Sequence, residues 1–411
     1  MTLRFTWDWE PAPRVRLPEQ AATWCRLRIA LGSTHATLVE QRDGSGGPRH
    51  GLDVSAYPLA EFLAINWWRL STSSHLPTER GVHLVHAGAG FAWPDITLHS
   101  DHGLTWASLR QRDKAPEHVR FLTQTDLVLD SDAALSAIAS FIDSTVRRLE
   151  DQGITGTLLQ DEWAAIQHAD QDERDFCLTA AAWGLDPYDI PGDAQHLLLD
   201  AEASIGNPAL LADLSRAVPL THLADSTRWL RDAIASLKPE PNTLPSVSPV
   251  DWSSATDAAP WQVGYERARE LRSRLGLAPG RRAAVEDLLR VRETGSPAPG
   301  NVDALISADG SASLAVVVGD DTSPQAKRFV SARAIGRHSL SPIDGLSLLT
   351  RAGQYTERAE RAFAAEFLAP AAGIAEVVDG DFSDPALDRA ATHFQVSRTL
   401  VEHQVENQIA A

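Results

Sequence analysis

The chain has 411 residues, 43% of them hydrophobic and 22% charged, and carries a net charge of −18. This length exceeds what one ordinary core holds, so at least two domains are predicted, and the composition is typical of a soluble globular protein. No apolar run reaches the roughly 18 residues of a membrane-spanning helix, and the first residues lack the apolar segment of a signal peptide. Cys25 and Cys177 are the only cysteines, which excludes a disulfide framework and a cysteine-rich zinc site. We therefore expect a cytoplasmic protein that does not bind a membrane.

The acidic charge is concentrated in the N-terminal part. Residues 261–411 contain 17 basic and 20 acidic side chains, whereas residues 1–260 contain 20 basic and 35 acidic ones. An acidic surface repels the phosphate backbone of nucleic acids. The N-terminal part is therefore predicted not to bind nucleic acid, and its charge either suits a basic protein partner or serves only solubility.

Residues 1–238 are predicted to form a mixed α/β unit followed by helices. The alternating pattern of residues 22–40 indicates a β-hairpin, and apolar residues recur at helical spacing over 57–70. A longer helical pattern extends over 132–169, and Asp130 precedes it as a candidate N-cap. Further helices are expected up to the end of this part.

A proline-rich segment separates this part from the rest of the chain. Residues 239–260 contain five prolines with serine, threonine and aspartate between them. Such a composition does not bury enough apolar surface to fold alone. We therefore predict a linker at 239–260 and a second domain at 261–411.

The second domain is predicted to contain a small sheet and several helices. Pro324 follows a cluster of aspartate, threonine and serine residues, which is typical of the first turn of a helix. The expected elements are a helix at 261–275, a helical piece at 285–291, a β-hairpin at 301–306 and 313–318, a helix from 324 through 337, a helix at 356–368, and a helix-turn-helix at 386–409.

The helix that follows Pro324 has the frame of a zinc-peptidase active-site helix without its zinc chemistry. In such a helix, two histidines four residues apart bind the metal, and a glutamate directly after the first histidine is the general base. Here these three positions hold Arg333, Ala334 and Arg337. The question is therefore whether the domain is a peptidase at all.

The order of parts from Trp261 onward resembles the ImmA/IrrE family of metallopeptidases. The motifs that carry the resemblance are Arg328-Phe329-x-x-Ala332, Glu357 followed by Phe363-Ala364 and Leu368-x-Pro370, and Phe394-x-Val396-Ser397. The resemblance implies an α+β protein whose C-terminal domain is zincin-like, with a small β-sheet, an active-site-type helix and a terminal helix-turn-helix. It also implies that Glu357 stands at the position of the third zinc ligand.

Carried over to this chain, the family pattern leaves an incomplete site. An arginine offers no lone pair to a metal, and an alanine cannot activate water. A catalytic zinc needs about three protein ligands, of which Glu357 alone remains. We therefore predict no catalytic residue and no cofactor at these positions. Our hypothesis is that a bidentate salt bridge from Arg333 or Arg337 to Glu357 replaces the zinc.

A displaced zinc site is the alternative. His338 follows the second ligand position and lies about 100° further around the helix, so it would bind a metal beside Glu357 only if the helix slipped. We interpret His338 as a surface or cap histidine instead. Zinc is the expected cofactor if the alternative holds.

The first functional hypothesis is an inactive ImmA/IrrE-like pseudoenzyme. The resemblance implies a regulatory protein in bacterial stress, phage or mobile-element regulation, which binds a protein partner such as a transcriptional repressor without cutting it. The alternative is an active zinc metallopeptidase that cleaves a repressor through a displaced metal site. DNA binding by the helix-turn-helix is disfavoured, because residues 385–411 contain only Arg389 and Arg398 as arginine or lysine residues.

Overall fold

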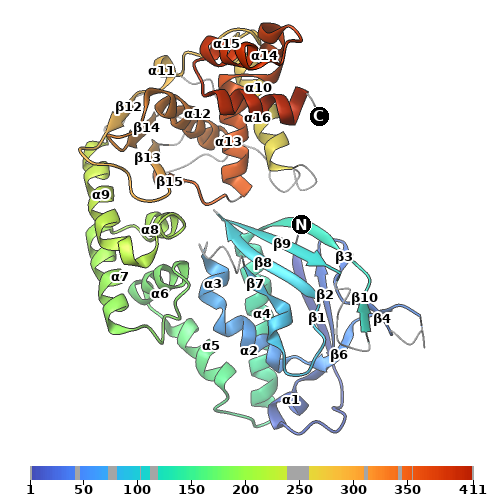
Figure 1. Ribbon diagram of the computed structural model, residues 1–411. Helices are drawn as coiled ribbons and strands as arrows, with labels where there is room; N and C mark the ends of the chain where they lie inside the picture. Colours follow the sequence, from blue (N-terminus) through green and yellow to red (C-terminus); the bar gives the residue numbers. More distant parts are fainter. Residues whose placement is uncertain are drawn as a thin grey trace. The chain divides into compact units, whose positions relative to one another are not determined.

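The computed structural model describes residues 2–41, 47–72, 81–101, 103–111, 119–237, 259–309, 313–340, 345–353 and 355–409. The described residues fall into two compact units, the first ending at Ile190 and the second beginning at Pro191 (Figure 1). Both units combine helices and strands, which confirms the predicted α+β class. In the described part of the chain, no helix has the length and apolar character needed to cross a bilayer.

The strands of the first unit pair in antiparallel sheets. They are β1 (Leu3–Trp9), β2 (Trp24–Leu31), β3 (Thr34–His35), β4 (Leu38–Gln41), β5 (Arg49–His50), β6 (Leu52–Ser55), β7 (Val82–His83), β8 (Asp95–Asp101), β9 (Leu104–Arg110), β10 (Val119–Phe121) and β11 (Thr125–Asp130). The strand orders are β1-β2-β3 with β6 also on β2, β10-β4-β5, and β11-β9-β8-β7. The hairpin predicted within residues 22–40 is present as β2 and β3, but the second strand, expected over 36–39, lies at Thr34–His35, and β4 pairs with β10 and β5 instead.

The helices of the first unit surround a core that these sheets share. They are α1 (Pro18–Ala22), α2 (Tyr57–Ile65), α3 (Trp67–Ser71), α4 (Ser131–Asp151), α5 (Leu158–His168) and α6 (Gln171–Ala182). The helix predicted over 57–70 is interrupted at Asn66. Asp130 caps α4 as predicted, because its carboxylate accepts a hydrogen bond of 2.9 Å from the backbone N–H of Ala133.

The second unit is built around one mixed sheet. Its described strands are β12 (Val291–Glu293), β13 (Val302–Asp309), β14 (Ser313–Val318) and β15 (Gly345–Thr350), in the order β12-β14-β13-β15. The predicted hairpin is confirmed by the antiparallel pairing of β13 with β14, and its turn lies outside the described residues. The helical prediction for 285–291 is wrong at its end. There, a short helix α11 (Val285–Leu288) leads into β12, because the apolar residues near 291 add a parallel strand to β14.

Helices cover both faces of this sheet. Along β13 and β14, Ile306 and Val316 are buried in a core shared with α12 (Pro324–Leu340), whereas their neighbours Leu305 and Val317 are buried on the opposite face. The opposite face packs against α8 (Pro208–Ser215) and α9 (Leu223–Ser236), and α7 (Gly192–Ile205) precedes them. Trp229 of α9 donates a hydrogen bond of 3.1 Å from its indole N–H to the Thr294 hydroxyl.

The compact units divide the chain at a different place from the predicted domain boundary. The prediction assigned residues 1–238 to an N-terminal domain, whereas α7 to α9 belong to the second unit. Because both faces of the second sheet are apolar, the sheet needs this additional helical layer, and periodicity cannot tell which sheet a helix covers. The predicted linker 239–260 lies outside the described residues except for its last two positions.

The remaining helices of the second unit pack around α12. They are α10 (Pro260–Arg274), α13 (Tyr355–Leu368), α14 (Ala371–Val378), α15 (Asp384–Phe394) and α16 (Arg398–Gln404), followed by a π-helical turn at Val405–Ile409. The predicted helix-turn-helix is present as α15 and α16, joined through Gln395 in the left-handed conformation with φ of 53°. Helix α12 lies between the sheet and α13 (Figure 1).

Helices α10 and α13 pack unusually closely, and a glycine permits it. A Cβ atom at Gly264 would overlap the carbonyl oxygen of Ala359 and lie 2.9 Å from the backbone nitrogen of Phe363. The backbones therefore touch where α10 crosses α13. This contact holds α13, which carries several of the acidic and basic side chains described below.

We predict that Gly264→Ala lowers the free energy of unfolding by about 1–3 kcal/mol, because the added methyl group forces α10 and α13 apart. Gly295→Ala is the matched control, since a Cβ atom there meets nothing within 4 Å. Urea denaturation followed by circular dichroism measures both. Equal stability of the two variants would contradict the close contact.

Candidate functional site

Arg333 and Arg337 lie inside the second unit. From Val330 to Leu340, every residue of α12 except His338 is buried, so the helix is enclosed on all sides. Arg333 is 0% exposed and Arg337 is 5% exposed. Four residues apart, the two arginines share one face of α12. Two buried guanidinium groups require anionic partners, because an unpaired buried charge is strongly destabilising.

The partner of both arginines is Glu360 of α13. Arg337 donates from Nη1 to Glu360 Oε1 at 2.6 Å, and Arg333 donates from Nη2 to Glu360 Oε2 at 3.3 Å. Arg333 also donates from Nη2 to the carbonyl oxygen of Thr350 at 2.9 Å and pairs through Nη1 with Asp303. We call these side chains, Asp303, Arg333, Arg337 and Glu360, the arginine network.

The predicted salt bridge to Glu357 is therefore wrong in its acceptor. Glu357 makes no ion pair with Arg333 or Arg337 among the described residues, and its two carboxylate oxygens accept from the Thr350 hydroxyl and, at 2.6 Å, from the Gly353 backbone N–H. Glu357 thus fastens the segment between β15 and α13. The acceptor is Glu360 because it lies almost one helical turn further along α13, deeper beside α12.

Burial and charge act against each other at these carboxyl groups. At Glu360, complete burial is the largest influence and raises the pKa, and the charges of Arg337 and Arg333 oppose it. At Glu357, burial also raises the pKa. There, the Thr350 hydroxyl, the charges of Arg333 and Arg216 and the Gly353 N–H together outweigh burial and hold the pKa below its ordinary value. Glu357 is therefore ionised at neutral pH.

Asp303 connects the arginine network to the surface. Its side chain pairs with the buried Arg333 on one oxygen and accepts a hydrogen bond of 2.7 Å from Nε of the exposed Arg351 on the other. Both carboxylates of the network are thus shared between two arginines. This alternation of signs lets the buried charges neutralise each other.

The residues at the predicted metal position do not fit zinc. The two positions assigned to histidines carry guanidinium groups that already bind Glu360, and neither group has a lone pair to offer. His338 is half-buried, its Nδ1 lacks a hydrogen-bond partner, and burial lowers its pKa. Among the described residues, no group of three or more His, Cys, Asp or Glu side chains is arranged to hold a metal.

A large cleft adjoins the arginine network. It has a volume of about 730 Å³ and lies between α10, α12, α13 and α16. Asp303 and Arg351 line it, so the network reaches the cleft at this point. Much of the lining is apolar and includes Trp261, Tyr265, Phe329, Ala362, Leu368 and Leu400.

The helix-turn-helix forms one wall of this cleft instead of presenting a basic face. Gln404 of α16 donates hydrogen bonds of 2.9 Å to Glu366 and 3.0 Å to the carbonyl oxygen of Ala369, which hold α16 against α13. Arg398 pairs with Asp384, Asp388 and Glu402, and Arg389 lies 3.7 Å from Asp381. These ion pairs engage both arginines of the motif with carboxylates of the same motif and of the segment before it.

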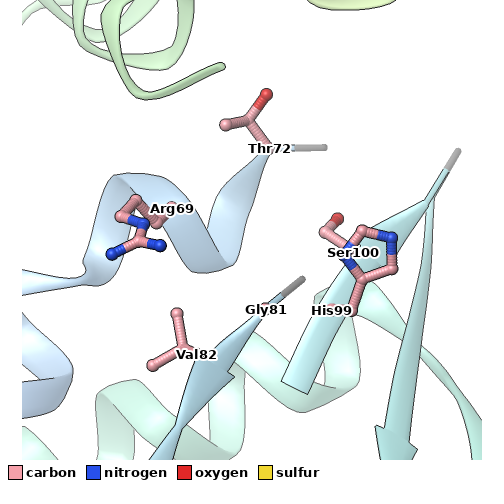
Figure 2. A pocket seen from close by; sticks show the side chains of 6 residues that line it. All are labelled: Arg69, Thr72, Gly81, Val82, His99 and Ser100. Carbon is pink, nitrogen blue, oxygen red and sulfur yellow. The ribbon is translucent and has the colours of Figure 1, made fainter. Parts of the chain in front are cut away.

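The first unit contains a second, much smaller cavity. Its volume is about 10 Å³, enough for roughly one water molecule. Figure 2 shows the side chains around it, which come from α3, β7, β8 and the residues beside them: Arg69, Thr72, Gly81, Val82, His99 and Ser100. This volume is too small for a substrate, so the larger cleft is the candidate site.

Sequence reasoning found two members of the arginine network and missed two. The sequence spacing could have indicated Glu360 as an acceptor, because it follows Glu357 by three residues and lies near the same face of α13. Asp303 gave no such signal, since its approach to Arg333 depends on how β13 is placed next to α12.

No protein-family model matches the chain, and no curated protein is similar to it in sequence. A functional assignment therefore rests on the chemistry of the arginine network and the cleft.

We predict that Glu360→Gln lowers the free energy of unfolding at neutral pH by about 3–5 kcal/mol, because two buried guanidinium groups lose their shared charge partner. Glu293→Gln is the control: Glu293 forms an exposed pair of 2.6 Å with Lys327, and its loss costs less than about 1 kcal/mol. Urea denaturation of both variants measures the difference. A loss below about 1 kcal/mol for Glu360→Gln would show that this carboxylate does not balance the arginines.

We predict that Glu357→Gln is less stable than the native protein at neutral pH and that this difference shrinks in acid. A carboxyl group whose folded pKa is depressed stabilises the fold above its unfolded pKa, near pH 4.3, and loses that contribution as the pH falls through the folded value. The expected difference at neutral pH is about 1.5–3 kcal/mol. Denaturation curves recorded from neutral pH downward test it, and a difference that does not depend on pH would refute the depressed pKa.

Proposed function

We propose that the second unit is an inactive peptidase-like domain of the ImmA/IrrE type, which binds a polypeptide segment in the cleft and does not hydrolyse it. The observation that carries the proposal is the arginine network beside the cleft. It fills the face of α12 where an active relative would hold zinc, and it shares Asp303 with the cleft wall.

The chemistry of the site supports binding without hydrolysis. Peptide hydrolysis by a zinc peptidase needs a metal-bound water and a general base beside it. Ala334 stands where the base is expected, and its methyl group has no proton-transfer capacity. The carboxylates beside this position are Asp303 and Glu360, which pair with the arginines, and Glu357, which accepts hydrogen bonds from Thr350 and Gly353.

The shape and lining of the cleft support a polypeptide ligand. A volume of about 730 Å³ lies within the range of ligand-binding clefts and has room for several side chains. Trp261 is 49% exposed at its edge, and Phe329 and Leu400 are partly exposed within it. Exposed aromatic and aliphatic side chains in a hollow are typical of protein-binding sites.

In this proposal the biological role is regulatory. The resemblance to ImmA/IrrE proteins suggests a transcriptional repressor as the partner, held by the cleft and released intact. The protein would then act by competing for the repressor or by relocating it. The acidic first unit would contribute recognition or regulation.

We predict that peptides selected from a phage-displayed library on the full-length protein bind through this cleft. Because Ala365 lines the cleft, Ala365→Arg should lower their affinity at least about tenfold. Ala375→Arg is the control: Ala375 is an exposed residue of α14, so this variant should bind the peptides as tightly as the native protein. Isothermal calorimetry measures each affinity.

The same peptides also test for hydrolysis. After incubation with the protein and added zinc, mass spectrometry should find them intact, and elemental analysis should find no stoichiometric zinc in the dialysed protein. Cleaved peptides together with one zinc per chain, both lost in Glu357→Ala, would establish the active peptidase with a displaced site. Peptides that bind Ala365→Arg as well as the native protein would remove the cleft from the proposal.

A further inference from the structure

One arginine of the cleft has no partner among the residues that the structure describes. Arg361 of α13 lines the cleft and is half-buried, and it has no hydrogen bond or ion pair with any described residue. Burial lowers its pKa, and the nearby charge of Arg333 acts in the same direction. A partly desolvated guanidinium that lacks an acceptor is costly, so a ligand that supplies an acceptor gains an unusually favourable contact.

The neighbouring carboxylates are already committed to other groups. Asp303 is shared between Arg333 and Arg351, and Glu360 is shared between Arg333 and Arg337. Arg361 is attracted at longer range by Glu357 first and then by these two carboxylates, but it forms no ion pair with any of the three. Arg361 therefore lines the cleft with donors that no described residue accepts.

Arg358 extends this free positive charge along the same helix. It precedes Arg361 by three residues, so both side chains leave α13 on one side, and both line the cleft. Arg358 is exposed and donates from Nε to the Gly353 carbonyl oxygen at 3.1 Å, which leaves its two terminal nitrogens for a ligand. Two guanidinium groups on one wall thus face the cleft together.

The charge of the cleft is opposite to that of the protein. The described residues of its lining include three arginines, Arg351, Arg358 and Arg361, and one aspartate, Asp303, whereas the whole chain has a net charge of −18. The N-terminal turn of α12 also lines the cleft at Gln325 and Ala326, and a helix N-terminus adds positive potential. The cleft is therefore electrostatically complementary to an anionic ligand.

We propose that the ligand of this cleft is an acidic polypeptide segment, in which aspartate or glutamate side chains bind Arg361 and Arg358 and a neighbouring apolar side chain packs on Phe329 and Leu400. This inference rests on the proposed function and specifies its ligand. A peptide is favoured over a nucleic acid because the cleft is mostly apolar, and its two free arginines are too few for the phosphate contacts that hold a nucleic acid at physiological salt.

Fluorescence anisotropy with three pools of short labelled peptides tests the inference on the full-length protein. The pools are randomised mixtures of leucine with glutamate, leucine with glutamine, and leucine with lysine, and all peptides are acetylated and amidated so that they carry no terminal charge. We expect the glutamate pool to bind about tenfold more tightly than the glutamine pool, and the lysine pool to bind most weakly. The preference should decrease as the salt concentration rises.

Arg361→Gln should abolish most of the preference for the glutamate pool, so that the glutamate and glutamine pools bind with similar affinity. Arg389→Gln is the matched control, because Arg389 is an exposed arginine of α15 outside the cleft. Arg361→Lys keeps the charge without the planar fork and should retain part of the preference.

The outcomes separate the inference from the function on which it rests. If all three pools bind equally and Ala365→Arg weakens all of them, the cleft binds peptides and the acidic preference is wrong. If no pool binds, both fail. If a peptide binds only when its C-terminal carboxylate is free, that carboxylate and not an acidic side chain is the group that binds. If a labelled oligothymidylate binds in an Arg361-dependent manner, the ligand is a nucleic acid and not a peptide.

Discussion

The second unit depends on how two buried arginines of α12 are neutralised. A guanidinium group stays protonated in a protein, so Arg333 and Arg337 can be buried only where carboxylates meet them. Glu360 forms ion pairs with both arginines, and Asp303 of β13 forms a further ion pair with Arg333. Through these contacts α12, α13 and β13 are held in one arrangement. A buried ion pair adds little net stability over an apolar contact, but it is costly to break, which makes the arrangement specific.

This arrangement also determines what the cleft presents to a ligand. Because Asp303 and Glu360 are paired within the network, Arg361 and Arg358 form no ion pair with any carboxylate in the described part of the chain. The charges within the network balance one another. The adjoining cleft therefore has a positive accessible charge and a mostly apolar lining. In the proposed function, such a cleft recognises a ligand through its charged groups and its apolar lining.

The sequence predicted the elements better than it predicted their partners. Helices at 261–275 and 356–368 and the hairpin of β13 and β14 follow from periodicity and punctuating residues, and they are present. The sequence analysis predicted Glu357 as the acceptor of the arginines, whereas the structure has Glu360. A motif gives only the spacing of residues along the chain and does not show which turn of α13 faces α12. The assignment of α7 to α9 failed for a related reason: the apolar pattern of a helix does not say which sheet it covers.

An experimental structure with anomalous diffraction data at the zinc absorption edge, from crystals grown with zinc, tests the central claim most directly. The account predicts that the guanidinium groups of Arg333 and Arg337 lie on the Glu360 carboxylate and that no zinc peak lies beside them. A zinc peak within coordination distance of Glu357 or His338, with either arginine turned away from Glu360, would contradict it.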